Sequence, residues 1–138
     1  MDIDPDLFVS VDRIGGSGKV KIQIPDILCL EWSSHIKMVI VHMSNGAKYY
    51  LPGTVTFWGE FMISSGFKFV DVDRTNWVNA ENVQWVETDP FPRVCFGGKF
   101  FCSMRGTKPR LQETVESLLR ANPSIAVKYN KKQKWSLI

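Results

Sequence analysis

The stretch FVDVDRTNWVNAENVQWVE, from Phe69 to Glu87, contains two apolar runs separated by a short polar break. Each run alternates apolar and polar residues as a half-buried β-strand does, and the break around Arg74 predicts a corner between two strands. We expect this corner to point Arg74 out of the sheet while Trp77 and Val78 anchor the chain in the core. A guanidinium fork matches the base edge of guanine in the major groove of DNA, provided that the backbone beneath it is rigid.

The remaining sequence predicts a mainly β domain with two helices. Alternating runs predict strands over residues 8–13, 19–24, 26–31, 37–43, 47–51, 67–72, 77–87, 94–96 and 99–103. Thr54 is suited to cap a helix with the apolar face Val55, Trp58, Phe61 and Met62. A second helix is expected from near Thr107 to Asn122, with the apolar stripe Leu111, Val115, Leu118 and Leu119. This stripe could pack within the monomer, which we favour, or form a dimer contact.

The pair Asn45-Gly46 predicts the register of one hairpin. It is a strong signal for a two-residue turn, and such a turn would place Met43 opposite Lys48 and His42 opposite Tyr49.

Three cysteines cannot all pair, and none has the spacing of a metal or redox motif. With a two-residue turn at residues 97–98, Cys95 would oppose Phe100 and lie diagonally from Cys102, beyond comfortable disulfide reach. We therefore expect the cysteines, Cys29 included, to be reduced and packed as small hydrophobic residues.

Composition bounds the class of protein. The chain has 138 residues, 44% of them apolar and 12% aromatic, which fits one globular domain. The sequence has no apolar run of the roughly 18 residues that a membrane span needs, so we expect no membrane span.

Motifs for catalysis are weak. The segment GGSGK at residues 15–19 departs from the phosphate-binding loop pattern, because Arg13 and Val20 replace its first glycine and its Ser or Thr. The two histidines, His35 and His42, have no third ligand at metal spacing. Ser103 has no flanking nucleophile motif. We predict no enzyme activity, no cofactor and no metal.

The charge is divided unevenly along the chain. Residues 1–92 carry seven Lys or Arg against twelve Asp or Glu, a net charge of −5, whereas residues 93–138 carry ten against two, a net charge of +8. A basic half is expected of a phosphate-binding surface, but a solvated basic tail would give the same pattern. Three basic residues, Lys37, Arg74 and Arg105, follow or precede predicted strands, and placement on loops between rigid strands favours binding.

From about Lys21 to Gly106 the chain resembles the LytTR family of bacterial DNA-binding domains. The matching pieces follow in the family's order: IPDILCLEW, MVIVHMSNGAKYYL, TVTFWGEFM, FKFVDVDRTNWVNAENVQWVE and FFCSMRG. Each piece is weak alone, and the ordered set of about 85 residues is specific. The resemblance implies a compact domain of about ten strands in small antiparallel sheets with a short helix. It also implies binding of double-stranded DNA by loops in successive major grooves, with two copies on direct repeats.

Carried over by position, the residues that the resemblance assigns to base reading are Lys37 or its neighbour His35, Arg74 and Arg105. Thr75, Asn76 and Asn79 would contact the DNA backbone or hold the corner in shape, and Lys108 is a further candidate contact. The family usually has a histidine where this chain has Asp73, which leaves the sequence read at the corner open.

We expect residues 1–106 to form the DNA-binding domain, followed by a C-terminal helix and a basic tail, YNKKQKW, over residues 107–138. The predicted function is a transcription regulator that binds specific DNA sequences, either as a stand-alone protein or as a domain of a longer one. The alternative is a protein-interaction module on the same fold, which binds a regulatory protein partner and binds DNA only weakly and without sequence preference.

Overall fold

A computed structural model describes residues 3–128 of the chain. In chain order its elements are β1 (Asp6–Ser10), β2 (Lys19–Gln23), η1 (Ile24–Asp26), β3 (Ile27–Ser33), β4 (Met38–Met43), β5 (Lys48–Leu51), α1 (Val55–Ser64), β6 (Phe69–Asp71), β7 (Asn76–Asn79), η2 (Ala80–Asn82), β8 (Trp85–Glu87), β9 (Arg93–Cys95), β10 (Phe101–Ser103), α2 (Arg110–Ala121) and β11 (Ala126–Lys128). The prediction of a mainly β fold with two helices is confirmed. The basic tail lies outside the described residues.

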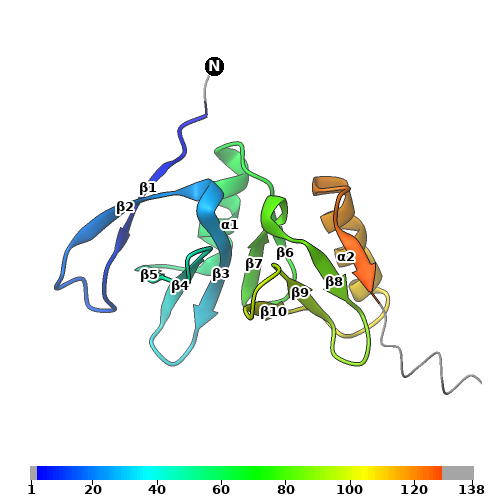
Figure 1. The fold of residues 1–138 in the computed structure, drawn as a ribbon. Helices are drawn as coiled ribbons and strands as arrows, with labels where there is room; N and C mark the ends of the chain where they lie inside the picture. Colours follow the sequence, from blue (N-terminus) through cyan, green and yellow to red (C-terminus); the bar gives the residue numbers. More distant parts are fainter. Residues whose placement is uncertain (1–2, 129–138) are drawn as a thin grey trace, which may run out of the picture.

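The strands form two sheets that stand side by side (Figure 1). The larger sheet has the order β2-β1-β5-β4-β3-β7-β6, and all its pairs are antiparallel. The smaller sheet has the order β10-β9-β8-β11, in which only the β11–β8 pair is parallel. Helix α1 contacts β3, β6 and β7, and α2 contacts β6 and η2.

Strands β3 and β7 are buried on both faces because they separate two hydrophobic cores. Leu30 and Trp77 face the first core, which lies under α1, whereas Cys29 and Val78 face the second core, between the two sheets and α2. Successive residues of a strand point to opposite faces, so all four residues of β7 are buried. The prediction that Trp77 and Val78 anchor the corner in the core is confirmed.

Helix α1 begins as the sequence predicts. The Thr54 hydroxyl oxygen accepts a hydrogen bond of 3.0 Å from the Phe57 N–H, which satisfies one of the N–H groups left free at a helix start. Gly59 lies against the Trp77 ring so closely that a Cβ there would stand 2.8 Å from Cε2 of the indole. The glycine therefore sets how closely α1 approaches the sheet.

The predicted register of the β4–β5 hairpin is wrong by one residue. His42 pairs with Lys48 and not with Tyr49, and the Met43 N–H donates to the Ala47 carbonyl. The connection is a three-residue loop that ends at Gly46, whose φ is +89°. Such loops place a left-handed residue before the returning strand, which glycine adopts without steric cost.

The β9–β10 register is also shifted. Cys95 pairs with Phe101 and not with the predicted Phe100, because the connection is longer than two residues. All three cysteines are free and buried, as predicted.

Other boundaries differ from the prediction. The strand expected over residues 77–87 is interrupted by η2, and strand β1 begins and ends earlier than predicted.

Helix α2 begins at Arg110, three residues after the predicted start. Leu111 and Leu118 are buried in the second core, and Val115 and Leu119 are packed against it. The stripe thus packs within the monomer, the favoured of the two alternatives. Strand β11, which the sequence analysis did not predict, follows α2 and pairs in parallel with β8. No helix among residues 3–128 is long and apolar enough to cross a membrane.

Candidate nucleic-acid interface

Three segments that are distant in sequence meet at one end of the domain. Glu31 of β3 pairs with Asn76 of β7, so the turn after β3 and the corner before β7 are neighbours. The Trp32 N–H donates to the Thr75 carbonyl over 2.8 Å, which joins these two segments directly. The Arg105 N–H donates to the Val72 carbonyl over 2.9 Å, which attaches the segment after β10. In Figure 1 the turn between β3 and β4 lies at the lower edge of the larger sheet.

The corner at residues 73–75 is held by the carboxylate of Asp73. Its Oδ1 accepts hydrogen bonds from the Thr75 N–H (2.8 Å), the Thr75 hydroxyl (3.2 Å) and the Asn76 N–H (2.9 Å). Its Oδ2 accepts from the Asn76 side-chain amide at 3.2 Å. Asp73 thus folds the backbone around itself, as aspartate does in turns. This gives the aspartate a structural role at the position where the family usually has histidine.

Arg74 lies at the tip of this corner. Its side chain is exposed, and it makes no hydrogen bond or ion pair with any other described residue. The backbone on both sides is fixed by the bonds to Asp73. A free guanidinium on a fixed backbone is the arrangement that the sequence predicted.

The β3–β4 turn, residues 34–37, carries the next two candidates. His35 and Lys37 are both exposed. Lys37 has a φ of +56°, and its N–H donates to the Ser33 carbonyl at 2.7 Å. The left-handed region is uncommon for a residue with a side chain. The backbone conformation of the turn at Lys37 is therefore narrowly defined, and it sets the direction in which the Lys37 side chain leaves the turn.

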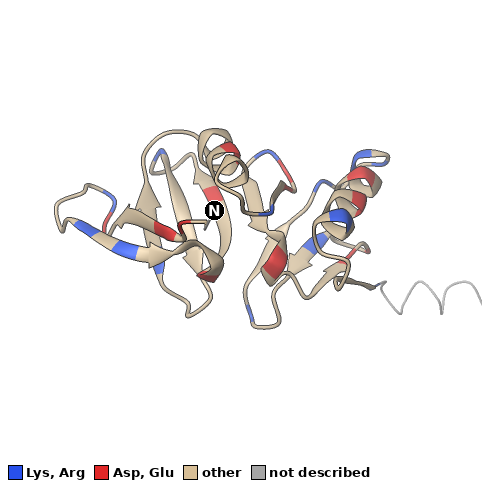
Figure 2. Ribbon diagram, turned by 90° about the horizontal axis from the view of Figure 1, so that it is seen from above, with Lys and Arg blue, Asp and Glu red and all other residues tan. Residues whose placement is uncertain are grey.

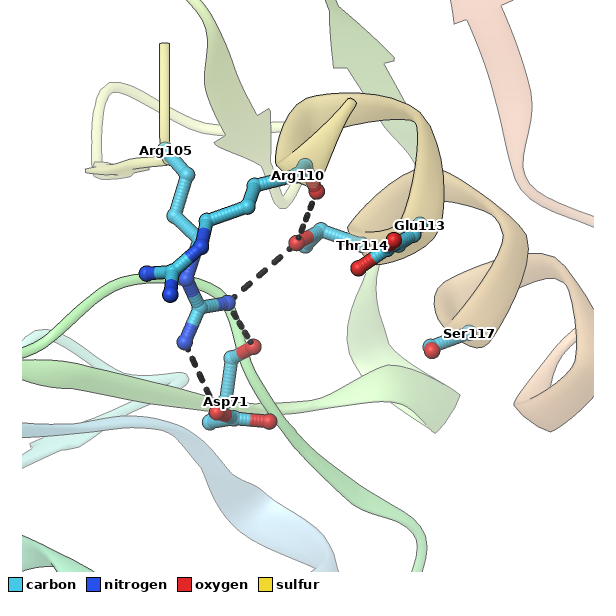
Figure 3. Close-up of a pocket in the computed structure, with 6 residues that line it drawn as sticks. All are labelled: Asp71, Arg105, Arg110, Glu113, Thr114 and Ser117. Carbon is cyan, nitrogen blue, oxygen red and sulfur yellow. Dashed lines mark hydrogen bonds and ion pairs between the residues drawn. The ribbon is translucent and has the colours of Figure 1, made fainter. Parts of the chain in front are cut away.

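Arg105 is not free, in contrast to Arg74. Its Nη1 donates to the Asp71 carbonyl (2.8 Å) and to the Thr114 hydroxyl (3.2 Å), and its Nη2 forms an ion pair with Asp71 Oδ2 at 2.8 Å. Figure 3 shows this guanidinium between β6 and α2. The side chain is 22% exposed. The bonds join three elements and fix the orientation of the fork, which leaves Nε and part of the edge for a ligand.

Two of the predicted contact residues are structural. Asn76 and Asn79 are 8% and 2% exposed. Asn76 braces the corner through Asp73, and Asn79 caps η2 by accepting from the Glu81 N–H at 3.3 Å. Of the alternatives left by the sequence, their burial favours holding the chain in shape. Thr75 and Lys108 are exposed.

An acidic residue adjoins the site from within the sheet. Glu31 Oε1 lies 2.8 Å from Nε2 of the buried His42. This hydrogen bond lowers the pKa of the Glu31 carboxyl below its ordinary value, because it favours the charged form. The Glu31 carboxylate is therefore bonded to His42, in the part of β3 that pairs with Asn76 next to the corner.

Sequence reasoning did not identify Asp71, Arg110 and Thr114 as part of this region. Asp71 is 34 residues from Arg105 in sequence, and only the paired sheets bring them together. Figure 2 shows basic positions on α2 and on the chain that leads into it, beside acidic positions. Among residues 93–128 seven are Lys or Arg and two are Glu, so the basic character of this part does not depend on the tail alone.

No protein-family model matches the sequence, and no curated protein matches it. The fold is similar to that of a solved structure, the LytTr DNA-binding domain of a Bacillus cereus protein described as a methyl-accepting/DNA response regulator. The TM-score is 0.60 and the identity 11%, over 86% of this chain and 96% of that domain. The chain therefore has a LytTR-type fold, which confirms the predicted resemblance at the level of fold.

Proposed function

We propose that this protein binds double-stranded DNA sequence-specifically and regulates transcription. The observation that carries the proposal is Arg74, an exposed arginine without a partner among the described residues, on a corner fixed by four hydrogen bonds to Asp73. Because the backbone beneath Arg74 is already fixed, only the freedom of its side chain is lost when the fork binds a base edge. The similarity in fold to a DNA-binding domain supports the same function.

Two neighbouring segments, the β3–β4 turn and the segment after β10, form the proposed reading surface together with the corner at Arg74. Lys37, or His35 beside it, and Arg105 lie in segments joined to the corner by backbone hydrogen bonds. We propose that the three loops enter successive major grooves and that two copies occupy direct repeats, as the family resemblance implies. The proposed role is non-enzymatic, needs no cofactor and belongs to the cytoplasm.

Replacement of Arg74 tests this function, with Arg13→Ala as the matched control. Arg13 is exposed in the β1–β2 connection, at the opposite edge of the larger sheet from β7 and β6. Both variants remove one positive charge. Arg74→Ala should weaken binding to a selected DNA site by about 1–3 kcal/mol and relax specificity at one position, whereas Arg13→Ala should leave specificity unchanged. Fluorescence anisotropy with the selected site and single-base variants measures both. Equal binding by the two variants would contradict the assignment.

A second candidate function, a protein-interaction module on the same fold, is favoured by one observation. The outer face of α1 exposes Phe57 (58%) and Phe61 (41%), which form an aromatic cluster with Trp58. An exposed aromatic patch can mark a protein contact. This function predicts weak DNA binding without sequence preference and a stoichiometric complex with a protein, which gel filtration of the copurified complex would measure.

A further inference from the structure

A polar pocket of about 330 Å³ lies beside the segment after β10 that carries Arg105. It is lined by Asp71, Arg105, Arg110, Glu113, Thr114 and Ser117, and Figure 3 shows their arrangement. Two of these residues come from the end of β6 and from the segment after β10, and the other four from α2. The Arg105 N–H is bonded to the carbonyl of Val72, the residue before the corner, so the pocket adjoins the segment that leads into the corner.

Two guanidinium groups converge at the pocket. Arg105 forms one side and is held by Asp71 and Thr114. Arg110, at the start of α2, lines the same pocket, and in Figure 3 its side chain extends from the helix toward the side of the pocket that Arg105 forms. Arg110 is exposed and forms no ion pair with another described residue. Because Arg105 is already paired with Asp71, an anion in the pocket would supply the opposite charge that Arg110 lacks among the described residues.

The other lining groups define what kind of anion fits. The hydroxyls of Thr114 and Ser117 lie on the α2 side, and Ser117 Oγ accepts from Arg120 Nη2 at 3.1 Å. Both carboxylates of the pocket, Asp71 and Glu113, oppose a bound anion, and the charge of Asp71 is balanced by Arg105. The attraction for an anion therefore comes from Arg110. Arginine forks match the oxygens of a phosphate in a bidentate manner. The pocket therefore suits one tetrahedral phosphate better than a planar base edge.

We infer that this pocket binds a backbone phosphate of DNA through Arg110, while Arg105, held by Asp71 and Thr114 at the edge of the pocket, keeps the base-reading role proposed above. The inference rests on the proposed function and deepens it, because it assigns to α2 a contact that positions the reading loops on the duplex. Phosphate contacts fix register and carry no sequence information. The contribution of Arg110 should therefore be equal for all DNA sequences.

Arg110→Ala tests the inference, with Arg120→Ala as its control on the same helix. Each variant removes one positive charge, but Arg120 does not line the pocket. Loss of one phosphate contact should reduce the slope of log K against log salt by about 0.9, and the ratio of specific to non-specific affinity should not change. Arg120→Ala should keep the wild-type slope. Arg110→Lys, which keeps the charge, should keep most of the slope, and circular dichroism establishes that each variant is folded.

Two outcomes would overturn the inference, and both are distinguishable from failure of the proposed function. If wild type binds a specific site and Arg110→Ala has the wild-type slope, the phosphate pocket is wrong and the proposed function stands. If wild type itself binds no specific site, the proposed function fails first. Titration of wild type with inorganic phosphate at constant ionic strength separates the two sources of phosphate. Binding tighter than millimolar, with the DNA slope unaffected by Arg110→Ala, would assign the pocket to a free phosphate compound.

Discussion

Replacement of Asp73 separates the rigidity of the corner from its charge. Asp73→Ala removes the acceptor for four hydrogen bonds of 2.8–3.2 Å. The Thr75 donors are exposed and can bond to water. Asn76 is 8% exposed, and its side-chain amide loses its acceptor, whereas its backbone N–H keeps a bond of 3.4 Å to the Asp73 carbonyl. An unsatisfied buried donor costs about 1–3 kcal/mol, and the net value of an exposed bond is about 1 kcal/mol. We therefore expect a loss of about 2–3 kcal/mol in the free energy of unfolding.

The same change should impair DNA reading. Fixing the backbone of one residue costs about 1–2 kcal/mol. In Asp73→Ala the backbone at Arg74 is no longer fixed before binding, so this cost reduces the free energy of DNA binding. Since 1.4 kcal/mol corresponds to about tenfold in affinity, specific binding should weaken by about five- to thirtyfold. Non-specific binding should strengthen slightly, because a negative charge beside the phosphates is removed. The specificity ratio should therefore fall.

Asp73→Asn is the matched control. Asparagine keeps an oxygen that accepts from the backbone N–H groups of Thr75 and Asn76, and it loses the charge. It should gain the same non-specific affinity as alanine while retaining most of the stability and specificity. Urea unfolding and anisotropy with specific and scrambled duplexes measure the two effects. If the alanine and asparagine variants have equal stability and equal specificity, the corner does not depend on this carboxylate and the reasoning is refuted.

Three further changes test other parts of the structure. Gly59→Ala should destabilise the fold by about 1–3 kcal/mol in urea, because its Cβ would overlap the Trp77 ring; unchanged stability would show that α1 can move away from the sheet. Hydrogen bonding with His42 lowers the pKa of Glu31 in the folded protein. The ionised Glu31 carboxylate therefore stabilises the fold at pH values above its unfolded pKa of about 4.3, and this contribution is lost as the pH falls through the lower pKa of the folded state. Glu31→Gln should thus have a flatter stability profile between about pH 5 and 3, by less than about 1 kcal/mol because the Glu31 side chain is 43% exposed; parallel profiles would contradict this. Arg105→Lys keeps the charge without the fork, so competition assays should show weaker specific and unchanged non-specific binding; wild-type specificity would exclude a role for the fork.

Local signals in the sequence predicted much of the fold. The Thr54 cap is present because the first helical N–H groups need an acceptor wherever the helix lies. The corner between β6 and β7 is present because alternation on either side of Arg74 requires each run to face a core. These features depend on residues within a few positions of one another, and local physics is sufficient to specify them.

Features that depend on distant partners were less predictable. Asn45-Gly46 is compatible with both a two-residue and a three-residue loop, and pairing across the rest of the hairpin selects the longer one. Strand β11 contains only three residues, too few for an alternating pattern, and it forms against β8, 41 residues earlier in the chain at Ala126 and Trp85. Contacts of this kind are fixed by tertiary packing.

The candidate site shows the same division. Arg74 could be predicted, because its exposure follows from the corner itself. The restraint of Arg105 could not, because Asp71 and Thr114 reach it only when β6 and α2 pack against the segment after β10. Arg110 has no distinguishing sequence signal, and it becomes notable only because it lines the same pocket as Arg105.

Selection of bound fragments from a genomic DNA library by the purified protein, at about 0.15 M salt, tests sequence-specific binding most directly. We expect a motif repeated in the same orientation, with a spacing near one helical turn, and we expect Arg74→Ala to lose the enrichment of that motif. Retention of fragments without any shared motif would contradict it, since the basic residues would then bind phosphates only.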